Sequence, residues 1–298
     1  MSRQTLGTAR SSKRDEFYTL YSDVKFELDH YLNQFKNKII YCPCDTDDSA
    51  FTQYFLELER SGVIKELVHT SLQDGIDFLS DSAVDEYRRC DIVVTNPPFS
   101  LFRQFLSLLD ELNKEFIIWG TNNCISYREF SKMLVKNRIG LGYTCNKTCT
   151  FEVPFKYFNS PDSKAFCENN KYYIKVPGCS VFTNLYVCRT SVDLTAKFND
   201  SYKKYSNFNA INVNRTSDIP CDYSGLMGVP ITYLSKHDPT KFNIVGIFNN
   251  FDETNYELGR ITGDLVKLDK PPWRTRGPCI DGNHPTYVRI LIQKISNS

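Results

Sequence analysis

The chain has 298 residues, a formal net charge of +1 and 41% hydrophobic residues, which is the composition of a globular protein with two domains or one large one. It excludes disordered, collagen-like and coiled-coil proteins, and apolar runs such as Phe116–Trp119 are too short to cross a bilayer. Residues 1–14 are polar and basic, so we expect no secretion signal, no membrane partner and a cytoplasmic location.

The charges are distributed unevenly along the chain. Residues 1–14 carry four basic groups and no acid, residues 15–186 have a net charge of −6, and residues 187–298 have a net charge of +3. A basic arm and a basic C-terminal part suit a polyanion held at its edges. Chance scatter of charges over a solvated surface is the alternative, and charge alone favours it.

Eleven cysteines without a secretion signal predict reduced thiols in a cytosol. Cys145, Cys149, Cys167 and Cys179 invite a zinc interpretation, but their spacings match no common zinc pattern and the four histidines are scattered. We therefore expect no metal site, and we expect most of these thiols to act as small buried hydrophobes.

Strands alternate with helices over the first half of the chain. Apolar periodicity and capping residues predict helices over 23–35, 49–60, 82–88, 100–113 and 126–135, with Ser49 and Ser100 as N-caps. Short apolar runs predict strands over 38–42, 66–69, 91–95, 115–119 and 138–143. This alternation is typical of an α/β fold with a doubly wound, mostly parallel, Rossmann-like sheet. Ligands bind at the carboxyl ends of such strands, where the loops after Cys42 and Thr95 are expected.

From about residue 187 the pattern changes. Loops lengthen, Asn, Asp, Gly and Pro become frequent, and the last clear strand is predicted over 286–293. We therefore divide the chain into a basic flexible arm over 1–14, a first domain over 15–186, and an irregular region over 187–298 that is attached to the first domain or interleaved with it.

The most informative segment is the strand 91–95 with the loop Asn96-Pro97-Pro98-Phe99 that follows it. The two prolines fix φ and remove two N–H donors, which leaves the Asn96 amide oxygen and the Pro97 carbonyl as acceptors. Such a pair can accept both hydrogens of a planar amino group, and Phe99 offers a flat face on which a base can stack. A Pro-Pro turn that simply ends a strand is the alternative.

This loop suits methyl transfer to an exocyclic amine such as adenine N6. The nitrogen is a poor nucleophile because its lone pair is delocalised into the ring. Two acceptors on its hydrogens draw it towards sp³ geometry and offset the developing positive charge. Holding a sulfonium methyl donor in line with the nitrogen, at about 3–3.5 Å, supplies much of the remaining rate enhancement. Neither a covalent intermediate nor a metal is needed.

Other segments join this loop in a pattern that resembles the EcoRI-type DNA adenine-N6 methyltransferases, in order from about residue 13 to residue 294. The loop alone is also similar to rRNA and glutamine-amide methyltransferases. The matching segments are DEFYT at 15–19, IYC at 40–42 with Cys44-Asp45, DIVVTNPPFSLF at 91–102, ISYRE at 125–129, FTNL at 182–185, DIP at 218–220, MGVPIT at 227–232 and RILI at 289–292.

The resemblance implies S-adenosylmethionine as the methyl donor and an adenine in duplex DNA as the target, with 15–186 as the catalytic domain and 187–298 as the target-recognition region. It makes Asn96, Pro97, Pro98 and Phe99 the catalytic residues. The cofactor-binding residues that it implies are Phe17, Tyr18, Thr19, Cys42, Cys44, Asp45, Asp77, Phe78 and Asn96.

The segments that supply these implied cofactor contacts differ in what they offer to the cofactor. Aromatic residues in 17–19 suit the sulfonium end of the cofactor through cation–π attraction. The loop 42–45 replaces the usual glycine-rich loop, since 42–61 contains no glycine, and His69-Thr70-Ser71 stands where an acid commonly holds the ribose. Asp77 matches the segment near the cofactor's adenine, and a plain helix-capping aspartate is the alternative.

A base inside a duplex cannot reach such a pocket, so the target adenine must be flipped out. It would stack on Phe99 and on a second aromatic, for which Phe151 is the candidate and an ordinary core phenylalanine the alternative. The expected phosphate or base contacts are Lys203, Lys204, Arg215, Arg274 and Arg276. The arm 1–14 would reach across the DNA.

The predicted protein is thus a monomeric, DNA-associated enzyme that either acts alone or accompanies a separate cognate restriction endonuclease. Two alternatives stay open. One is an S-adenosylmethionine-dependent N-methyltransferase that acts on RNA or on a protein glutamine. The other is a catalytically inactive, DNA-binding, methyltransferase-like protein.

Overall fold

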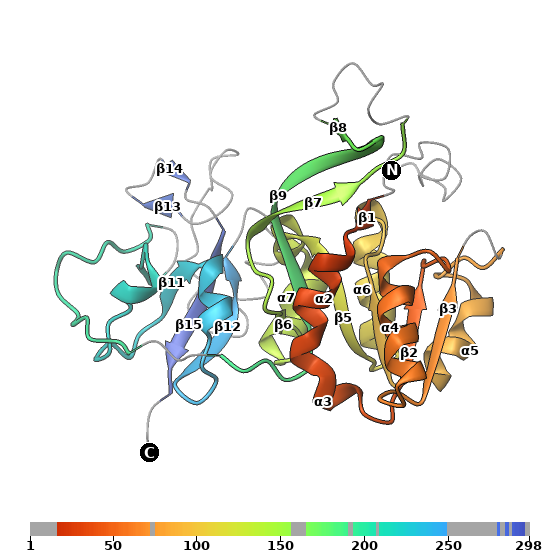
Figure 1. Ribbon diagram of the computed structural model, residues 1–298. Helices are drawn as coiled ribbons and strands as arrows, with labels where there is room; N and C mark the ends of the chain where they lie inside the picture. The colour runs from red at the N-terminus through yellow and green to blue at the C-terminus, as the bar shows by residue number, and fades with distance from the viewer. Residues whose placement is uncertain are drawn as a thin grey trace, which may run out of the picture. The chain divides into compact units, whose positions relative to one another are not determined.

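The computed structural model describes residues 17–71, 75–155, 165–189, 193–206, 209–248, 279–280, 284–285 and 288–295. These residues group into two compact units (Figure 1): unit 1 lies within Met1–Cys124 and Leu141–Tyr186, and unit 2 lies within Ile125–Gly140 and Val187–Ser298. A short stretch around residue 130 therefore groups with the C-terminal part of the chain. None of the helices in the described ranges is long and apolar enough to cross a membrane.

Unit 1 is built on a mixed sheet with the strand order β1-β7-β9-β5-β4-β2-β3, in which β6 and β8 also pair with β9. The central strands β3, β2, β4 and β5 run parallel, and β9, β7 and β1 extend the sheet in antiparallel pairs. The α/β class and the parallel centre are confirmed. The strands are β1 Tyr18–Thr19, β2 Ile39–Pro43, β3 Glu66–Thr70, β4 Ile92–Thr95, β5 Glu115–Thr121, β6 Gly140–Leu141, β7 Lys147–Glu152, β8 Phe166–Glu168 and β9 Lys171–Thr183.

The helices of unit 1 match the predicted ranges closely, with one exception at a helix start. Ser49 caps α4 as predicted, because its hydroxyl accepts a hydrogen bond of 3.1 Å from the Thr52 N–H. Ser100 does not cap α6, because the chain turns straight from Pro98 into a 3₁₀ turn that includes Ser100. The helical segments are α2 Tyr21–Leu28, η1 Asp29–Tyr31, α3 Leu32–Phe35, α4 Ala50–Arg60, α5 Asp81–Arg89, η3 Phe99–Leu101, α6 Phe102–Glu111 and η4 Asn122–Ser126, which runs into unit 2.

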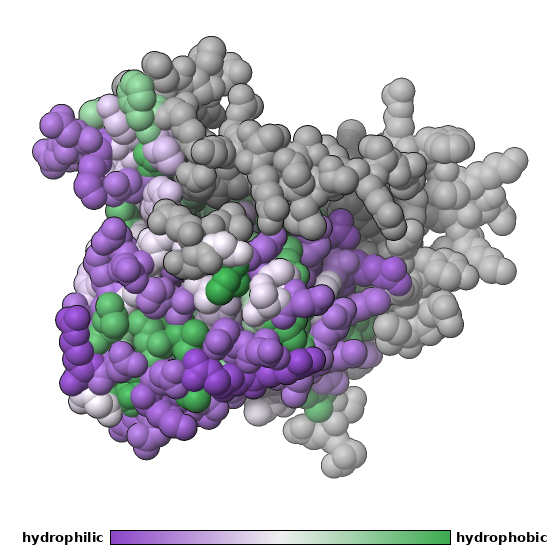
Figure 2. Space-filling view, turned by 90° about the vertical axis from the view of Figure 1, so that its right-hand side faces the viewer, coloured by the Kyte–Doolittle hydropathy of each residue, from purple (hydrophilic) through white to green (hydrophobic). Residues whose placement is uncertain are grey.

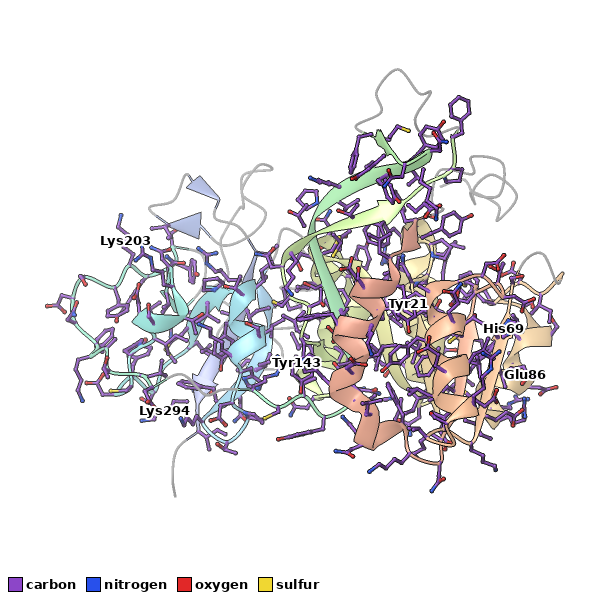
Figure 3. All side chains as sticks on the ribbon, viewed as in Figure 1. Tyr21, His69, Glu86, Tyr143, Lys203 and Lys294 are labelled. Carbon is purple, nitrogen blue, oxygen red and sulfur yellow. The ribbon has the colours of Figure 1, made fainter. Side chains whose placement is uncertain are left out.

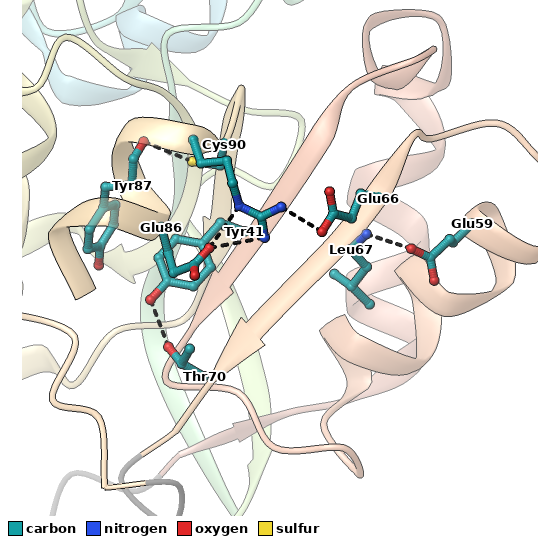
Figure 4. Close-up of polar contacts among 9 residues, drawn as sticks. Tyr41, Glu59, Glu66, Leu67, Thr70, Glu86, Tyr87 and Cys90 are labelled. Carbon is teal, nitrogen blue, oxygen red and sulfur yellow. Dashed lines mark hydrogen bonds and ion pairs between the residues drawn. The ribbon is translucent and has the colours of Figure 1, made fainter. Parts of the chain in front are cut away.

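Buried apolar strands hold the centre of unit 1 together. Every residue of β4 is fully buried, as expected for a parallel strand covered on both faces. The helix α5 is fastened beside β3 by Arg89, whose guanidinium pairs with Glu66 at 2.7 Å and with Glu86 at 3.1 Å (Figure 4). Beneath it, the rings of Tyr41 and Tyr87 meet edge to face at 4.9 Å.

A buried carboxylate fastens α2 to the segment that leads into β7. Glu27 is fully buried, and it accepts hydrogen bonds from the Tyr31 hydroxyl at 2.9 Å and from the backbone N–H groups of Tyr143 at 2.9 Å and Thr144 at 2.6 Å. A Cβ at Gly142 would collide with this carboxylate. Three donors thus satisfy a charge that would otherwise be costly to bury.

Unit 2 contains a four-stranded sheet with the order β10-β11-β15-β12 and a two-stranded pair of β13 and β14. The helix α7 packs against β12. The last strand begins at Arg289, three residues after the predicted start. The elements are α7 Arg128–Val135, β10 Ile211–Asn212, η5 Thr216–Asp218, β11 Met227–Pro230, η6 Ile231–Lys236, β12 Phe242–Phe248, β13 Cys279–Ile280, β14 His284–Pro285 and β15 Arg289–Lys294.

Two expectations about the sheets need correction. The strand predicted over 138–143 is only the two-residue β6, because the Glu27 carboxylate takes the N–H groups of Tyr143 and Thr144. The long strand β9 and its partner β7 were not predicted. Among the residues coloured in Figure 2, hydrophilic side chains are the most frequent, with hydrophobic areas among them, as on ordinary protein surfaces.

Candidate functional site

The loops after β2 and β4 meet at the carboxyl edge of the parallel strands. The Thr95 hydroxyl oxygen lies 2.7 Å from the Pro43 carbonyl oxygen and 2.8 Å from Asp45 Oδ2. From β2 the chain crosses to β3 on one side, whereas β4 lies on the other side. This is the point at which open α/β sheets bind ligands, so the loops expected at this edge do come together.

Burial gives Asp45 unusual acid–base properties. The residue is 7% exposed, and burial raises its pKa to about 7, against the lowering effect of hydrogen bonds with Thr95 and Ser49. A hydroxyl carries one proton, so Thr95 can donate to only one of its two neighbours. Both contacts are satisfied when Asp45 is protonated and donates to Thr95, which in turn donates to the Pro43 carbonyl.

Asn96 comes next, and the N-terminal segment fixes the orientation of its amide. Its Nδ2 donates to the Phe17 carbonyl at 2.9 Å and to the Thr19 hydroxyl at 3.2 Å. Because the Phe17 carbonyl can only accept, it determines which amide atom is nitrogen. The other atom, Oδ1, is buried and has no hydrogen-bond partner within the described part of the chain. Leaving a buried acceptor unpaired costs about 1–3 kcal/mol, so Oδ1 is able to accept a hydrogen bond from a ligand.

Strand pairing brings the N-terminal segment to this loop. Thr19 and Tyr18 of β1 pair with Phe151 and Glu152 of β7 in an antiparallel register. Thr19 is 9% exposed, whereas Tyr18 is 53% exposed. The segments 17–19 and 96–99, which the sequence links only through resemblance, are therefore direct neighbours.

Three phenylalanines form a cluster beside Asn96. The rings of Phe17 and Phe99 stack at 5.3 Å with an interplanar angle of 24°. Phe151 meets both rings edge-on, at 5.7 Å and 6.2 Å. Phe151 is 1% exposed and packs with Cys149 and Cys179. One face of Phe99 is thus covered by Phe17, and Phe151 supports both rings from the core.

The loop after β2 makes a tight turn without glycine. Cys44 has φ 79°, a left-handed conformation that glycine adopts freely and other residues adopt at a cost of about 1–3 kcal/mol. Cys42 is fully buried within β2, where it pairs with His69 of β3. Cys44 therefore provides the turn for which the sequence supplies no glycine.

Asp77 and Phe78 lie near this turn. Burial raises the pKa of the Cys44 thiol well above its usual value, and the charges of Asp45 and Asp77 raise it further, which places both carboxylates close to the thiol. Asp77 Oδ1 also accepts a hydrogen bond from the Leu79 N–H at 3.1 Å, so it stabilises the turn ahead of α5. Phe78 is buried against Phe105, with ring centroids 5.4 Å apart.

His69 lies within β3, near its carboxyl end (Figure 3). Its Nε2 lies 3.3 Å from Asp47 Oδ1. Its Nδ1 is buried and, within the described ranges, has no partner. The Tyr87 hydroxyl is likewise buried and unpaired there. Sequence reasoning noted His69 only as standing in place of an acid and did not single out Tyr87, because nothing in the pattern shows that the partners of these groups are missing.

The basic residues expected to contact a polyanion are only partly described. Lys203, Lys204 and Arg215 are all exposed in unit 2. Arg274, Arg276 and the arm 1–14 lie outside the described residues. In the parts of the chain that the structure covers, no group of three or more His, Cys, Asp or Glu side chains is placed to hold a metal ion.

Comparisons with known proteins identify the family of the chain. A family model described as "Adenine-specific methyltransferase EcoRI" matches residues 5–76 and 57–295. The chain belongs to this family. It is 35% identical to the type II methyltransferase M.MgeORF184P of Mycoplasma genitalium, over 96% of this chain and 97% of that protein. It is 34% identical to M.EcoRI of Escherichia coli, over 85% of this chain and 92% of that protein. It is 32% identical to M.MpnI of Mycoplasma pneumoniae, over 81% and 85%.

Membership of this EcoRI family makes the chain a methyltransferase. The family match covers residues of both unit 1 and unit 2. The relatives are named as type II methyltransferases, which associates them with restriction–modification.

Proposed function

We propose that the protein transfers a methyl group from S-adenosylmethionine to N6 of an adenine flipped out of duplex DNA. The observation that carries this proposal is the unpaired, buried Oδ1 of Asn96, whose orientation is fixed by Phe17 and Thr19. An acceptor held in place at a sheet edge, without a donor of its own, suits the amino group of a nucleobase.

The second acceptor is the Pro97 carbonyl. The neighbouring Pro98 carbonyl already accepts a hydrogen bond of 2.9 Å from the Leu101 N–H, so it is occupied. When bound, S-adenosylmethionine supplies the electrophilic methyl group. As N6 gains a fourth bond its hydrogens become more acidic, and their hydrogen bonds to Asn96 Oδ1 and the Pro97 carbonyl strengthen. The two acceptors thus stabilise the transition state more than the ground state.

The residues at this edge fit a cationic, nucleoside-bearing cofactor. Asp45 can release its proton near neutral pH and become an anion, and the Phe17 ring with the exposed Tyr18 offers aromatic surface to a sulfonium. The strained turn at Cys44 lets backbone approach a ligand closely. The proposed cofactor contacts are Phe17, Tyr18, Thr19, Cys42, Cys44, Asp45, Asp77, Phe78 and Asn96.

The flipped adenine would stack on the face of Phe99 that Phe17 does not cover. Such stacking is worth about 1–3 kcal/mol per base, which offsets part of the cost of unpairing the base. Phe151 acts in this proposal through its edge contacts with Phe17 and Phe99. Pro98 keeps the loop rigid between Pro97 and Phe99.

We further propose that the region 187–298 reads the target sequence and that the arm 1–14 grips the DNA backbone. Lys203, Lys204, Arg215, Arg274 and Arg276 are the proposed contacts. The enzyme would work as a cytoplasmic, DNA-associated monomer, and a separate restriction endonuclease of the same specificity would be its functional partner. The type II names of the relatives support this partnership.

The test is methyl transfer from tritiated S-adenosylmethionine to duplex DNA, RNA and protein offered in parallel to the purified chain. We expect label in duplex DNA, recovered as N6-methyladenine after digestion to nucleosides. Label recovered only in RNA or protein would overturn the proposed substrate. Failure to bind S-adenosylmethionine in calorimetry would indicate a non-catalytic DNA-binding protein instead.

A further inference from the structure

A polar cluster lies within the apolar sheet of unit 2. Asn212 is 6% exposed and Tyr205 is 5% exposed. Asn212 Oδ1 accepts hydrogen bonds from the Tyr205 hydroxyl at 2.7 Å and from Arg289 Nε at 3.2 Å, and its Nδ2 donates to Asn214 Oδ1 at 2.9 Å. Buried polar clusters of this kind are costly unless every member is satisfied, so this one is a built feature of the sheet.

The backbone is shaped to accommodate the cluster. Asn212 of β10 pairs with Gly228 of β11, which pairs in turn with Leu291 of β15. A Cβ at Gly228 would collide with the Tyr205 hydroxyl. Burial raises the pKa of Tyr205, and the nearby Arg289 lowers it, so the hydroxyl stays protonated and able to donate. A glycine and a tyrosine thus serve to hold one asparagine in place.

What this cluster positions is the guanidinium of Arg289, which is half-buried at the start of β15. Within the described part of the chain only Asn212 and Tyr205 interact with it. A guanidinium carries five N–H donors in one plane, so at least three remain for a ligand. Because Asn212 holds Nε and Tyr205 contacts the same guanidinium, the plane of the fork is fixed.

Exposed basic residues flank the strand β10 that carries Asn212. The Lys203 carbonyl accepts a hydrogen bond from the Asn212 N–H at 2.7 Å, Lys204 forms a bridge with Ile211, and Arg215 follows three residues after Asn212. Figure 3 shows Lys203 at the margin of unit 2, with its side chain directed outward. A fixed fork near exposed lysines is the arrangement expected where a protein meets DNA.

We propose that Arg289 reads a base edge in the target sequence, with the N7 and O6 acceptors of a guanine as its partner, and that Asn212 is its positioning residue. The inference rests on the proposed DNA substrate and deepens it. A contact to phosphate needs a positive charge but no side-chain plane held at a fixed angle, and the exposed lysines can make such contacts. Bidentate recognition of guanine needs a planar fork at a set angle, and the Tyr205–Asn212 pair sets that angle.

The test compares the methylated motif of the wild type with those of Arg289→Lys and Arg289→Gln, found by methylation-sensitive sequencing of random-sequence duplex DNA. The wild-type motif should contain a guanine, and both variants should methylate the same adenine with relaxed choice at that one position. Activity on the preferred site should fall by about tenfold to a hundredfold. The slope of DNA affinity against salt should stay unchanged, because no phosphate contact is lost.

Lys204→Ala is the matched control, since it should weaken binding to all sequences and reduce the salt slope by about one, with an unchanged motif. Asn212→Ala should relax the same position as the Arg289 variants while retaining the arginine, and thermal melting verifies that each variant is folded. An unchanged motif in Arg289→Lys and Arg289→Gln, or a motif change accompanied by a lowered salt slope, would overturn the inference. A wild type that methylates no DNA would instead refute the proposed function.

Discussion

The side-chain amide of Asn96 donates a hydrogen bond of 2.9 Å to the backbone carbonyl of Phe17, which lies 79 residues earlier in the chain. This bond joins the loop after β4 to the residue that precedes β1. It turns the amide nitrogen of Asn96 towards Phe17 and therefore Oδ1 away from Phe17. The orientation of the proposed catalytic acceptor therefore depends on the N-terminal segment of the fold. It follows that residues of β1 should affect the rate of methyl transfer.

The first prediction concerns Thr19, whose hydroxyl is the second acceptor for the Asn96 amide at 3.2 Å. Thr19→Val keeps the shape and removes the acceptor, at a cost of about 1 kcal/mol. We expect kcat to fall about fivefold in a tritium-transfer assay. Thr150→Val, on the adjacent β7, is the control and should stay within twofold of the wild type. Equal rates for the two variants would show that the Asn96 orientation does not depend on Thr19.

The second prediction concerns the buried tyrosines that meet edge to face beneath α5. The Tyr87 hydroxyl has no partner in the described part of the chain, whereas the Tyr41 hydroxyl lies 2.7 Å from Thr70 Oγ1. Tyr87→Phe removes an unsatisfied group and should raise the free energy of unfolding by about 1 kcal/mol, whereas Tyr41→Phe should lower it by about 1–2 kcal/mol. Urea unfolding measures both, and a loss of stability in Tyr87→Phe would contradict this account.

The third prediction concerns pH and Asp45, whose pKa is raised by burial to about 7 from about 3.9 in the unfolded chain. Between these values the folded state binds one more proton than the unfolded state. The contribution of Asp45 to stability is therefore complete below pH 4 and is lost as pH rises towards 7, by at most about 1.4 kcal/mol per pH unit. Above pH 7 the loss levels off.

Asp45→Asn tests this directly, because asparagine keeps the shape and does not titrate. The free energy of unfolding, measured in urea at pH 5 and pH 7, should fall more steeply in the wild type than in the variant. Parallel pH profiles for the two proteins would show that Asp45 is ionised in the folded state throughout this range.

The fourth prediction concerns the stacking surface at Phe99. Phe99→Ala should lower kcat/KM for duplex DNA by about tenfold to a hundredfold, since stacking of a flipped base is worth about 1–3 kcal/mol. With 2-aminopurine in place of the target adenine, the fluorescence change that reports flipping should diminish. Phe26→Ala, a half-exposed phenylalanine on α2, should change neither quantity. A Phe99 variant with normal fluorescence and rate would remove this residue from the site.

The parallel centre of unit 1 was accessible from sequence because its signals are local. Strands β2, β4 and β5 are short apolar runs, and Ser49 caps α4 as its position suggests. Strands β7 and β9 were missed because their stability comes from distant partners: Thr121 pairs with Cys179 and Thr19 with Phe151. The sequence of β9 also contains Pro177 and Gly178, which usually mark a loop.

The candidate site likewise contains features that are local in the sequence and features that depend on distant segments. The Asn96 loop could be identified because the residues that carry its chemistry are consecutive in the sequence. The left-handed turn at Cys44 and the polar cluster of Tyr205, Asn212 and Arg289 could not. A φ angle depends on the strands that flank the turn, and the cluster joins residues from separate strands that meet only in the folded sheet.

The central claim is that Asn96 Oδ1 accepts a hydrogen bond from the amino group that is methylated. The most direct measurement is single-turnover methyl transfer by Asn96→Ala on duplex DNA, paired with calorimetric binding of S-adenosylmethionine. We predict a rate at least a hundredfold below the wild type, with cofactor affinity within a few-fold of normal. A wild-type rate, or a loss of cofactor binding that accounts for the whole defect, would contradict the role assigned to Asn96.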